Sequence, residues 1–290
     1  MPPRSPATAH LRPSLYPVAF ELPRTLSPSK VTSFRDCALA FRFNAIDHLP
    51  DLPTIWTVKG TFVHSVLEGL FWHHGPGHRT PDAARAQFDR TWSDLQTDPD
   101  YRSLGLTPTQ ADQLRSESET LVDNYFALED PNEVTPVGIE LLLEARVGSM
   151  RLRGIIDRLD LTPDGDLVVI DYKTGRAPSP AFEHGKLIGV HIYALLCQEV
   201  LGQRPVQVKL LHLKEPTTII AEPSEQAVRG QRTKTLAVWS AIERACRDED
   251  FRPRTSPLCR FCRFQTFCPA YGGDPSEAAV VLGAAAGGAA

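Results

Sequence analysis

The fold is decided by two short segments, GIIDR at residues 154–158 and VVIDYKTG at residues 168–175. Each contains an apolar, β-prone run that ends at an aspartate, Asp157 in the first and Asp171 in the second. The turn sequence TPDGD at residues 162–166 separates them and predicts a hairpin. Such a hairpin places the two carboxylates at corresponding depths on neighbouring strands.

Two carboxylates that lie this close repel each other unless a positive charge lies between them. Their hard oxygen atoms suit Mg2+ or Mn2+, which polarises a phosphoryl oxygen and lowers the pKa of a bound water. Lys173 points to the same face of its strand as Asp171 and can orient that water or stabilise a transition state. Surface ion pairs at the ends of a hairpin are the alternative interpretation. Gly154, three residues before Asp157, and the Thr174-Gly175 turn favour the catalytic one.

The rest of the chain places this hairpin in an α/β fold. Strands flanked by helices on both sides in sequence imply a mixed central sheet flanked by helices. Two capped helical stretches, at residues 82–96 and 108–129, are expected to form a helical insert at about 82–130. We expect strands over residues 137–147, 150–161, 167–172, 206–213 and 217–221, and helices over 28–37, 59–72, 187–201 and 224–249.

The composition is that of an ordinary globular protein, with 290 residues of which 42% are hydrophobic and 23% charged. The formal net charge of −4 excludes coating of nucleic acid through overall charge and allows only a local basic groove. Prolines are concentrated in residues 1–25, which we predict to be disordered, and residues 271–290 are expected to form a flexible tail. A single domain is expected between them, at residues 26–270.

No stretch approaches about 20 apolar residues and no cleavable signal segment is visible, so a cytoplasmic protein without a membrane partner is expected.

In a cytoplasmic protein, the cysteine pattern indicates a bound metal. In that reducing compartment, clustered cysteines indicate ligands rather than disulfides, whereas Cys197 and Cys246 lie in predicted helices and are interpreted as buried apolar residues. Zinc ribbons pair two short CxxC hairpins. Here three cysteines lie in a C-terminal segment at about residues 251–270 and the fourth is distant, which favours a 4Fe-4S cluster. Zinc is the alternative. The candidate ligands are Cys37, Cys259, Cys262 and Cys268.

With these motifs, residues 26–270 resemble the PD-(D/E)XK nuclease superfamily. The resemblance is to its RecB-like branch, which includes the RecB and AddB exonuclease domains and the CRISPR-associated iron-sulfur nucleases. Leu26-Ser27-Pro28-Ser29 with Cys37 is similar to the opening helix of that branch, and Gly60-Thr61-Phe62-Val63-His64 is similar to its helical histidine motif. The catalytic core of the branch corresponds to residues 154–157 and 171–175.

The resemblance implies a restriction-endonuclease-like core and a set of roles. His64, Asp157 and Asp171 are expected to hold Mg2+ or Mn2+, and Lys173 to assist the attacking water. One early and three late cysteines are expected to hold a 4Fe-4S cluster that joins the two ends of the domain.

Two further positions are implied less directly. Glu140 corresponds to a position that is often acidic in this branch and is expected to be a further ligand or to support one, with Glu144 as the competing choice. Relatives usually carry a glutamine four residues before the tyrosine that corresponds to Tyr193, whereas this chain has Gly189. Tyr193 is therefore expected either to touch the substrate backbone or simply to pack its helix.

These expectations predict a metal-dependent DNA exonuclease or end-processing nuclease in DNA repair or recombination, acting on DNA ends or single strands. The alternative is a catalytically silent iron-sulfur DNA-binding module or an accessory subunit of a helicase-nuclease complex, and an RNA substrate stays open. A helicase partner is implied by the family alone, since the chain has no phosphate-binding loop of its own. Arg260 and Arg263, beside Phe261 and Phe264, are expected either to grip DNA or to solvate the loop over the cluster.

Overall fold

The computed structural model describes residues 20–177 and 183–278. Its centre is a five-stranded mixed sheet in the order β1-β2-β3-β4-β5, in which β3 and β4 are parallel and every other neighbouring pair is antiparallel. The predicted hairpin is formed by β2 and β3, and the mixed sheet confirms the predicted fold class. The strands are β1 (Pro136–Val147), β2 (Met150–Leu161), β3 (Leu167–Lys173), β4 (Gln207–His212) and β5 (Thr217–Ala221).

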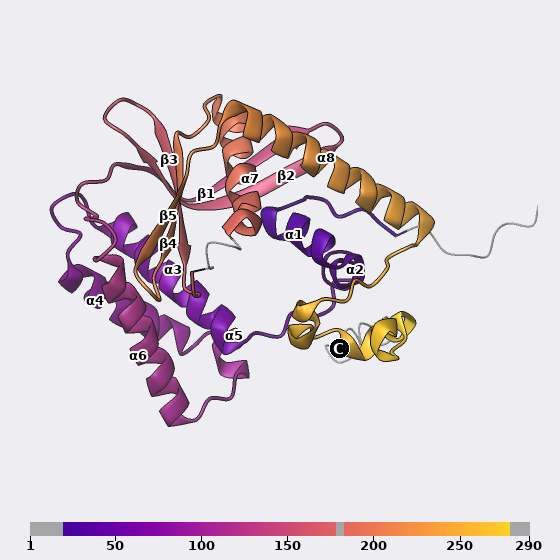
Figure 1. Cartoon of the computed structure of the whole chain (residues 1–290). Coiled ribbons are helices and arrows are strands. Elements are labelled where there is room, and N and C mark those ends of the chain that lie inside the picture. Colours follow the sequence, from indigo (N-terminus) through magenta and orange to yellow (C-terminus); the bar gives the residue numbers. More distant parts are fainter. Residues whose placement is uncertain (1–19, 178–182, 279–290) are drawn as a thin grey trace, which may run out of the picture.

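Helices cover the sheet in two groups, each with its own apolar core (Figure 1). The predicted insert packs with α3 over the half of the sheet that contains Ile170 and Tyr172. The opening helices and the last two long helices pack over the opposite face, around Ile156 and Val169. The first group is α3 (Ile55–His73), α4 (Pro81–Leu95), α5 (Pro99–Ser103) and α6 (Pro108–Tyr125); the second is α1 (Pro28–Asp36), α2 (Ala38–Ala45), α7 (Glu183–Leu201) and α8 (Glu225–Asp248).

The first helix ends earlier than the sequence predicts. Cys37 has extended backbone angles (φ −161°, ψ 111°), so α1 stops at Asp36 and a second helix, α2, starts directly after it. The N-terminal segment is also better packed than expected, because Phe20 lies edge-on against Phe251 with ring centroids 5.5 Å apart. At the other end Ala278 is buried in the core, while residues 1–19 and 279–290 lie outside the described ranges. Within the described ranges no helix is both long enough and apolar enough to cross a membrane.

The long strands β1 and β2 change their buried face halfway along. In β2, burial alternates from Met150 to Ile156, and the residues that follow are buried on both faces. Ile156 and Leu159 belong to the same core. In a regular strand, two side chains three residues apart point to opposite faces, so the strand changes its buried face between them. The pairing register of β1 with β2 places Glu140 opposite Asp157 at this change of face. The sheet therefore alters its packing at the two acidic positions.

A buried arginine joins the helical insert to the sheet. Arg158 has no exposed surface, and its guanidinium donates two hydrogen bonds to Asp160 (Nε to Oδ1 2.8 Å, Nη2 to Oδ2 2.9 Å). Its Nη1 also forms an ion pair with Glu129 at 2.6 Å and donates to the hydroxyl of Tyr172 at 2.9 Å. The guanidinium lies 4.4 Å from the centroid of the Phe71 ring in α3. Charge and aromatic contacts thus connect β2, β3 and the helices that cover them.

Replacement of this arginine is expected to destabilise the protein strongly. Arg158→Met leaves Asp160 and Glu129 without their cation in a buried setting, and loss of one partner of such a network costs about 3–5 kcal/mol. The free energy of unfolding, measured by urea denaturation, should fall by that amount. The matched control is Arg232→Met, which removes an exposed ion pair with Glu199 and should cost less than about 1 kcal/mol. Equal effects for the two variants would contradict the assigned role.

Candidate active site

The site lies where β2 separates from β3. The ladder between them ends at the pair Arg158 and Ile170. At the next position the Asp157 side chain takes the place of a strand carbonyl, and its Oδ2 accepts a hydrogen bond from the Tyr172 amide at 2.6 Å. The carboxylate is therefore oriented by the backbone of the neighbouring strand.

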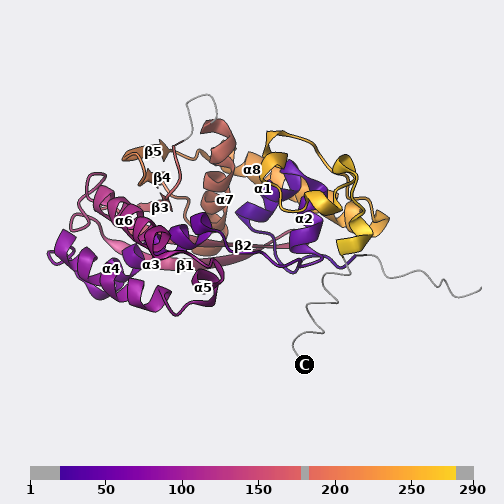
Figure 2. The ribbon, with the colours of Figure 1, turned by 90° about the horizontal axis from the view of Figure 1, so that it is seen from below.

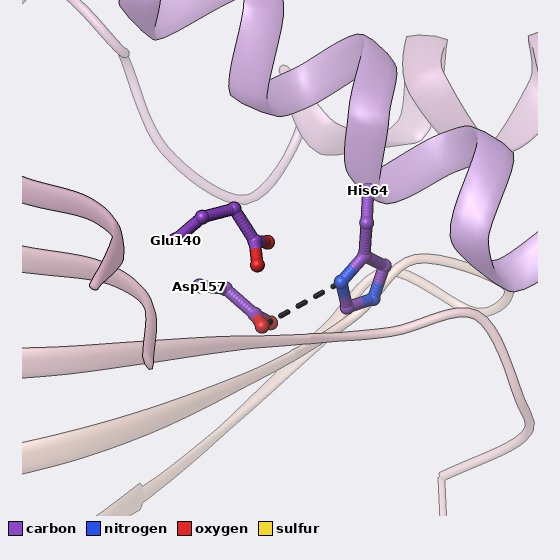
Figure 3. Close-up of side chains that lie close together, drawn as sticks. All are labelled: His64, Glu140 and Asp157. Carbon is purple, nitrogen blue, oxygen red and sulfur yellow. Dashed lines mark ion pairs between the residues drawn. The ribbon is translucent and has the colours of Figure 1, made fainter. Parts of the chain in front are cut away.

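His64, in the middle of α3, approaches the same point from the helical layer (Figure 3). Its Nδ1 lies 3.5 Å from Asp157 Oδ1, and its Nε2 lies 3.1 Å from the carbonyl oxygen of Tyr172. Burial alone would lower the pKa of His64, but the hydrogen bond and charge of Asp157 raise it above its ordinary value. The imidazole is thus held against both the Asp157 carboxylate and strand β3.

Glu140 completes a group of three potential ligands. One side-chain ligand atom from each of His64, Glu140 and Asp157 lies within 4.8 Å of the others, and Figure 3 shows the three side chains gathered together. Glu140 has a φ of +45°, a left-handed conformation that is unusual for a residue with a side chain. Such strain is often found at functional positions. The competing residue Glu144 instead forms an ion pair with Arg151 and is not part of the group.

The charges of the site fit a divalent cation. Burial raises the pKa of Glu140, and the nearby charges of Asp157 and Glu68 raise it further. Burial also raises the pKa of Asp171, with a further contribution from Asp157 that Lys173 opposes. The raised pKa values of Glu140 and Asp171 mean that nearby positive charge does not fully stabilise their ionised forms. An imidazole and several carboxylates are a donor set that Mn2+ or Mg2+ accepts.

Asp171 and Lys173 face a different hollow from the three grouped residues. They form an ion pair and line a hollow of about 1,100 Å³, whereas His64, Glu140 and Asp157 line one of about 390 Å³. The sequence predicts His64, Asp157 and Asp171 as the ligand set. The structure places Glu140 in the tight group and sets Asp171 apart from it, although the charge of Asp171 acts on His64.

Tyr193 both packs and faces the site. A Cβ on Gly154 would come within 2.8 Å of Leu196 and 3.3 Å of the Tyr193 ring, so the close packing of α7 on β2 explains the glycine three residues before Asp157. Burial raises the pKa of Tyr193, and so do the charges of Asp171 and Asp157. Gly189 lines the same large hollow, and a Cβ built there would meet no atom within 4 Å. The position that usually carries the family's glutamine is therefore open space.

The four candidate cysteines also line the large hollow, together with Asp171 and Lys173. Figures 1 and 2 show the C-terminal turns beside α1 and α2, although these segments lie at opposite ends of the sequence. The Sγ of Cys37 accepts a hydrogen bond from the Arg254 amide at 3.5 Å, and the Sγ of Cys259 accepts one from the Ser256 amide at 3.3 Å. Burial raises the pKa of Cys262, and the charges of the other three cysteines raise it further. The four cysteines therefore line one hollow, although among the described residues no three of their sulfur atoms lie within 4.8 Å of one another.

The other cysteines and the two arginines are placed elsewhere. Cys197 and Cys246 are buried in the core, as predicted. Arg263 forms an ion pair with Asp51, and the Arg260 guanidinium lies 4.6 Å from the centroid of the exposed Phe261 ring. Neither arginine lines the large hollow. Arg254, which belongs to the same C-terminal group of arginines in the sequence, lines it, and so does Arg176, which no sequence motif indicated.

Fold and site together define an α/β nuclease. The sequence pattern described as the PD-(D/E)XK nuclease superfamily matches residues 25–269, and the chain belongs to this superfamily. It is 25% identical over 266 residues to the Gene 69 protein of Mycobacterium phage D29, which covers 84% of this chain and 96% of the phage protein. A crystal structure from Eubacterium rectale with a provisional exonuclease assignment superposes with a TM-score of 0.49 and 12% identity, covering 83% of this chain and 87% of the other.

The grouped side chains predict how metal affinity responds to substitution. His64→Ala and Glu140→Gln each remove one ligand and should weaken Mn2+ binding by about tenfold or more. Glu144→Gln is the matched control, because that glutamate lies outside the group and should bind Mn2+ like the wild type. Isothermal titration of the purified variants with Mn2+ measures the effect. A Glu140→Gln titration that overlays the wild type would remove Glu140 from the site.

Proposed function

We propose that this protein is a metal-dependent DNA exonuclease or end-processing nuclease of the RecB-like branch. The observation that carries the proposal is the meeting of His64, Glu140 and Asp157 beside the Asp171–Lys173 pair at the separation of β2 from β3. Acidic ligands, an imidazole and a lysine at one opening of a sheet are the groups that phosphodiester hydrolysis requires. A role in DNA repair or recombination, on DNA ends or single strands and alongside a helicase, is part of this proposal and rests on the family.

Each residue has a distinct part in this proposal. His64, Asp157 and Glu140 hold Mg2+ or Mn2+, and Asp171 contributes its charge from the large hollow. The bound metal supplies a Lewis acid for the phosphoryl oxygen and a water of lowered pKa. Lys173 lies beside Asp171, where its ammonium group stabilises the negative charge that develops on the phosphate. The Tyr172 backbone holds Asp157 and His64 in place for substrate binding.

A 4Fe-4S cluster is the second part of the proposal. Its support is that Cys37, Cys259, Cys262 and Cys268 line one hollow and that backbone amides donate to two of the sulfurs. Such donors stabilise thiolates bound to a cluster. We infer a structural role, because the cysteines join α1 and α2 to the C-terminal turns. Zinc is the competing metal and is distinguished by elemental analysis.

A catalytically silent iron-sulfur DNA-binding module or accessory subunit is the second candidate. The open space beside Gly189, where relatives usually carry a glutamine, is the observation that favours it. The intact Asp157, Asp171 and Lys173 favour the enzyme, since binding alone requires no paired carboxylates beside a phosphate backbone.

Cleavage should depend on the lysine and on the aspartate beside it. Lys173→Ala and Asp171→Asn each remove transition-state stabilisation and should lower kcat by about 10²–10³-fold with the fold intact. The assay uses anaerobically purified protein with end-labelled single- and double-stranded DNA, with and without Mg2+ or Mn2+. Lys234→Ala, an exposed lysine on α8, is the control and should cleave normally. Near-normal cleavage by either site variant would refute the assignment, and a wild type without cleavage on any substrate would favour the binding module.

Loss of one cluster ligand should act on colour, stability and activity together. Cys37→Ser removes the ligand at the break between α1 and α2 and should abolish the broad brown absorbance, lower the Tm and reduce cleavage. Iron, sulfide and zinc content identify the bound metal. Cys246→Ala is the control, because this buried cysteine lies in the core and its loss should leave the colour unchanged. A Cys37→Ser protein that keeps its colour, or that loses colour while keeping full stability and cleavage, contradicts the proposal.

A further inference from the structure

One face of the β1–β2 ribbon leads away from the site toward solvent. Beyond Glu140 and Asp157, the strand register pairs Leu142 with Ile155, then Glu144 with Arg153, then Arg146 with Arg151. All six residues are exposed, whereas the alternate residues of the same strands point into the core. Figures 1 and 2 show α3 to α6 gathered around one end of the sheet, with the ribbon extending past them. These exposed side chains therefore form a row that begins at the candidate metal ligands.

The side chains of the row change from apolar to charged with distance from the candidate ligands. Closest to the ligands is an apolar pair, Leu142 and Ile155, which are 49% and 44% exposed. Ile155 also lines the small hollow with His64, Glu140 and Asp157, so the row and the site are continuous. Because Leu142 and Ile155 are paired across the two strands, they offer one apolar contact beside the charged site.

Three arginines follow the apolar pair. The row contains one carboxylate, Glu144, which lies opposite Arg153 and forms an ion pair with Arg151. The third arginine is Arg146, opposite Arg151. The row is therefore positive although the whole chain has a net charge of −4. Glu243 reaches Ser149 at the tip of the ribbon, beyond the last arginine.

The spacing suits a polymer of alternating apolar and anionic units. A strand rises about 3.4 Å per residue, so the apolar pair lies about 7 Å from Asp157, Arg153 about 14 Å and Arg151 about 20 Å. A nucleic acid combines apolar base faces with one negative phosphate per nucleotide, so a single strand can contact both kinds of position. A base on the apolar pair and phosphates on the arginines would follow one continuous path.

We propose that this row, defined as Leu142, Ile155, Arg153, Arg151 and Arg146, binds the DNA strand that flanks the cleaved bond. The inference rests on the proposed nuclease function and adds the direction in which substrate leaves the site. Phosphates contact Arg153, Arg151 and Arg146, while Leu142 and Ile155 contact the first flanking base. The row lies on the ribbon face opposite α7, and so on the other side from the cysteine-lined hollow.

The test combines Arg146→Ala with Arg153→Ala in one protein. The control carries Arg229→Ala with Arg232→Ala, which removes the same charge from exposed positions on α8. Cleavage of labelled single strands of about 4 and about 30 nucleotides is compared, because a strand of about 4 nucleotides that is bound at the site reaches few of the arginines. The row variant should raise KM for the long strand at least about fivefold with kcat unchanged, and should treat the short strand like the control.

Binding gives a second readout that does not need cleavage. The affinity for a fluorescent 30-nucleotide strand is measured by anisotropy at several salt concentrations, with Lys173→Ala as the background. Loss of two phosphate contacts should reduce the slope of log affinity against log salt by about 1.4. An affinity and slope equal to those of the control overturn the inference, and so does a KM change that is the same for both lengths. If no variant cleaves DNA but the slope falls as expected, the proposed catalysis fails while the binding row stands.

Discussion

The hydrogen bond from the Tyr172 amide to the Asp157 carboxylate is the contact on which the site depends. It forms where the backbone hydrogen bonds between β2 and β3 end, so the Asp157 side chain supplies the next acceptor for a β3 amide. The carbonyl of the same residue lies against His64, and its hydroxyl accepts from Arg158. Tyr172 of β3 thus orients two potential ligands with its backbone and contacts the helical insert with its side chain. Because Tyr172 lies between Asp171 and Lys173, a shift of β3 would move every part of the site.

The strand pair β1–β2 explains why the acidic residues meet where they do. Each strand is twelve residues long, and in β1 Ile139 packs against the core of the insert while Leu141 and Leu143 pack against the opposite core. The buried face changes at Glu140 and Asp157, and the change leaves both side chains outside either core. Glu140 has a left-handed backbone at this point. A conformation of this kind costs on the order of 1–3 kcal/mol, which the surrounding pairing offsets.

Much of this could be predicted from local pattern. The alternation of apolar residues, the turn at residues 162–166 and the capping residues place the hairpin and most helices within a few residues of where the structure has them. The residues that depend on contacts distant in sequence could not be found that way. Glu140 and Glu144 are both acidic residues of one strand, and only the register with β2 separates them. The buried network of Arg158 requires Glu129 from beyond α6, and the Cys37 sulfur at the break between α1 and α2 accepts a hydrogen bond from the amide of Arg254, 217 positions away.

The two hollows show that opposite layers build one site. His64 comes from α3 in the layer of the insert, while Lys173 and Asp171 face the layer that holds the cysteines. The ladder between β2 and β3 ends at the pair Arg158 and Ile170, next to Asp157 and Asp171, so the two hollows lie on either side of this point. In the proposed function each layer would act through β3: the insert through Arg158 and Tyr172, and the cysteine-bearing segments through Asp171 and Lys173, which line the same hollow as the cysteines. Loss of order in either layer would keep these candidate side chains in the chain but would remove the geometry that places them together.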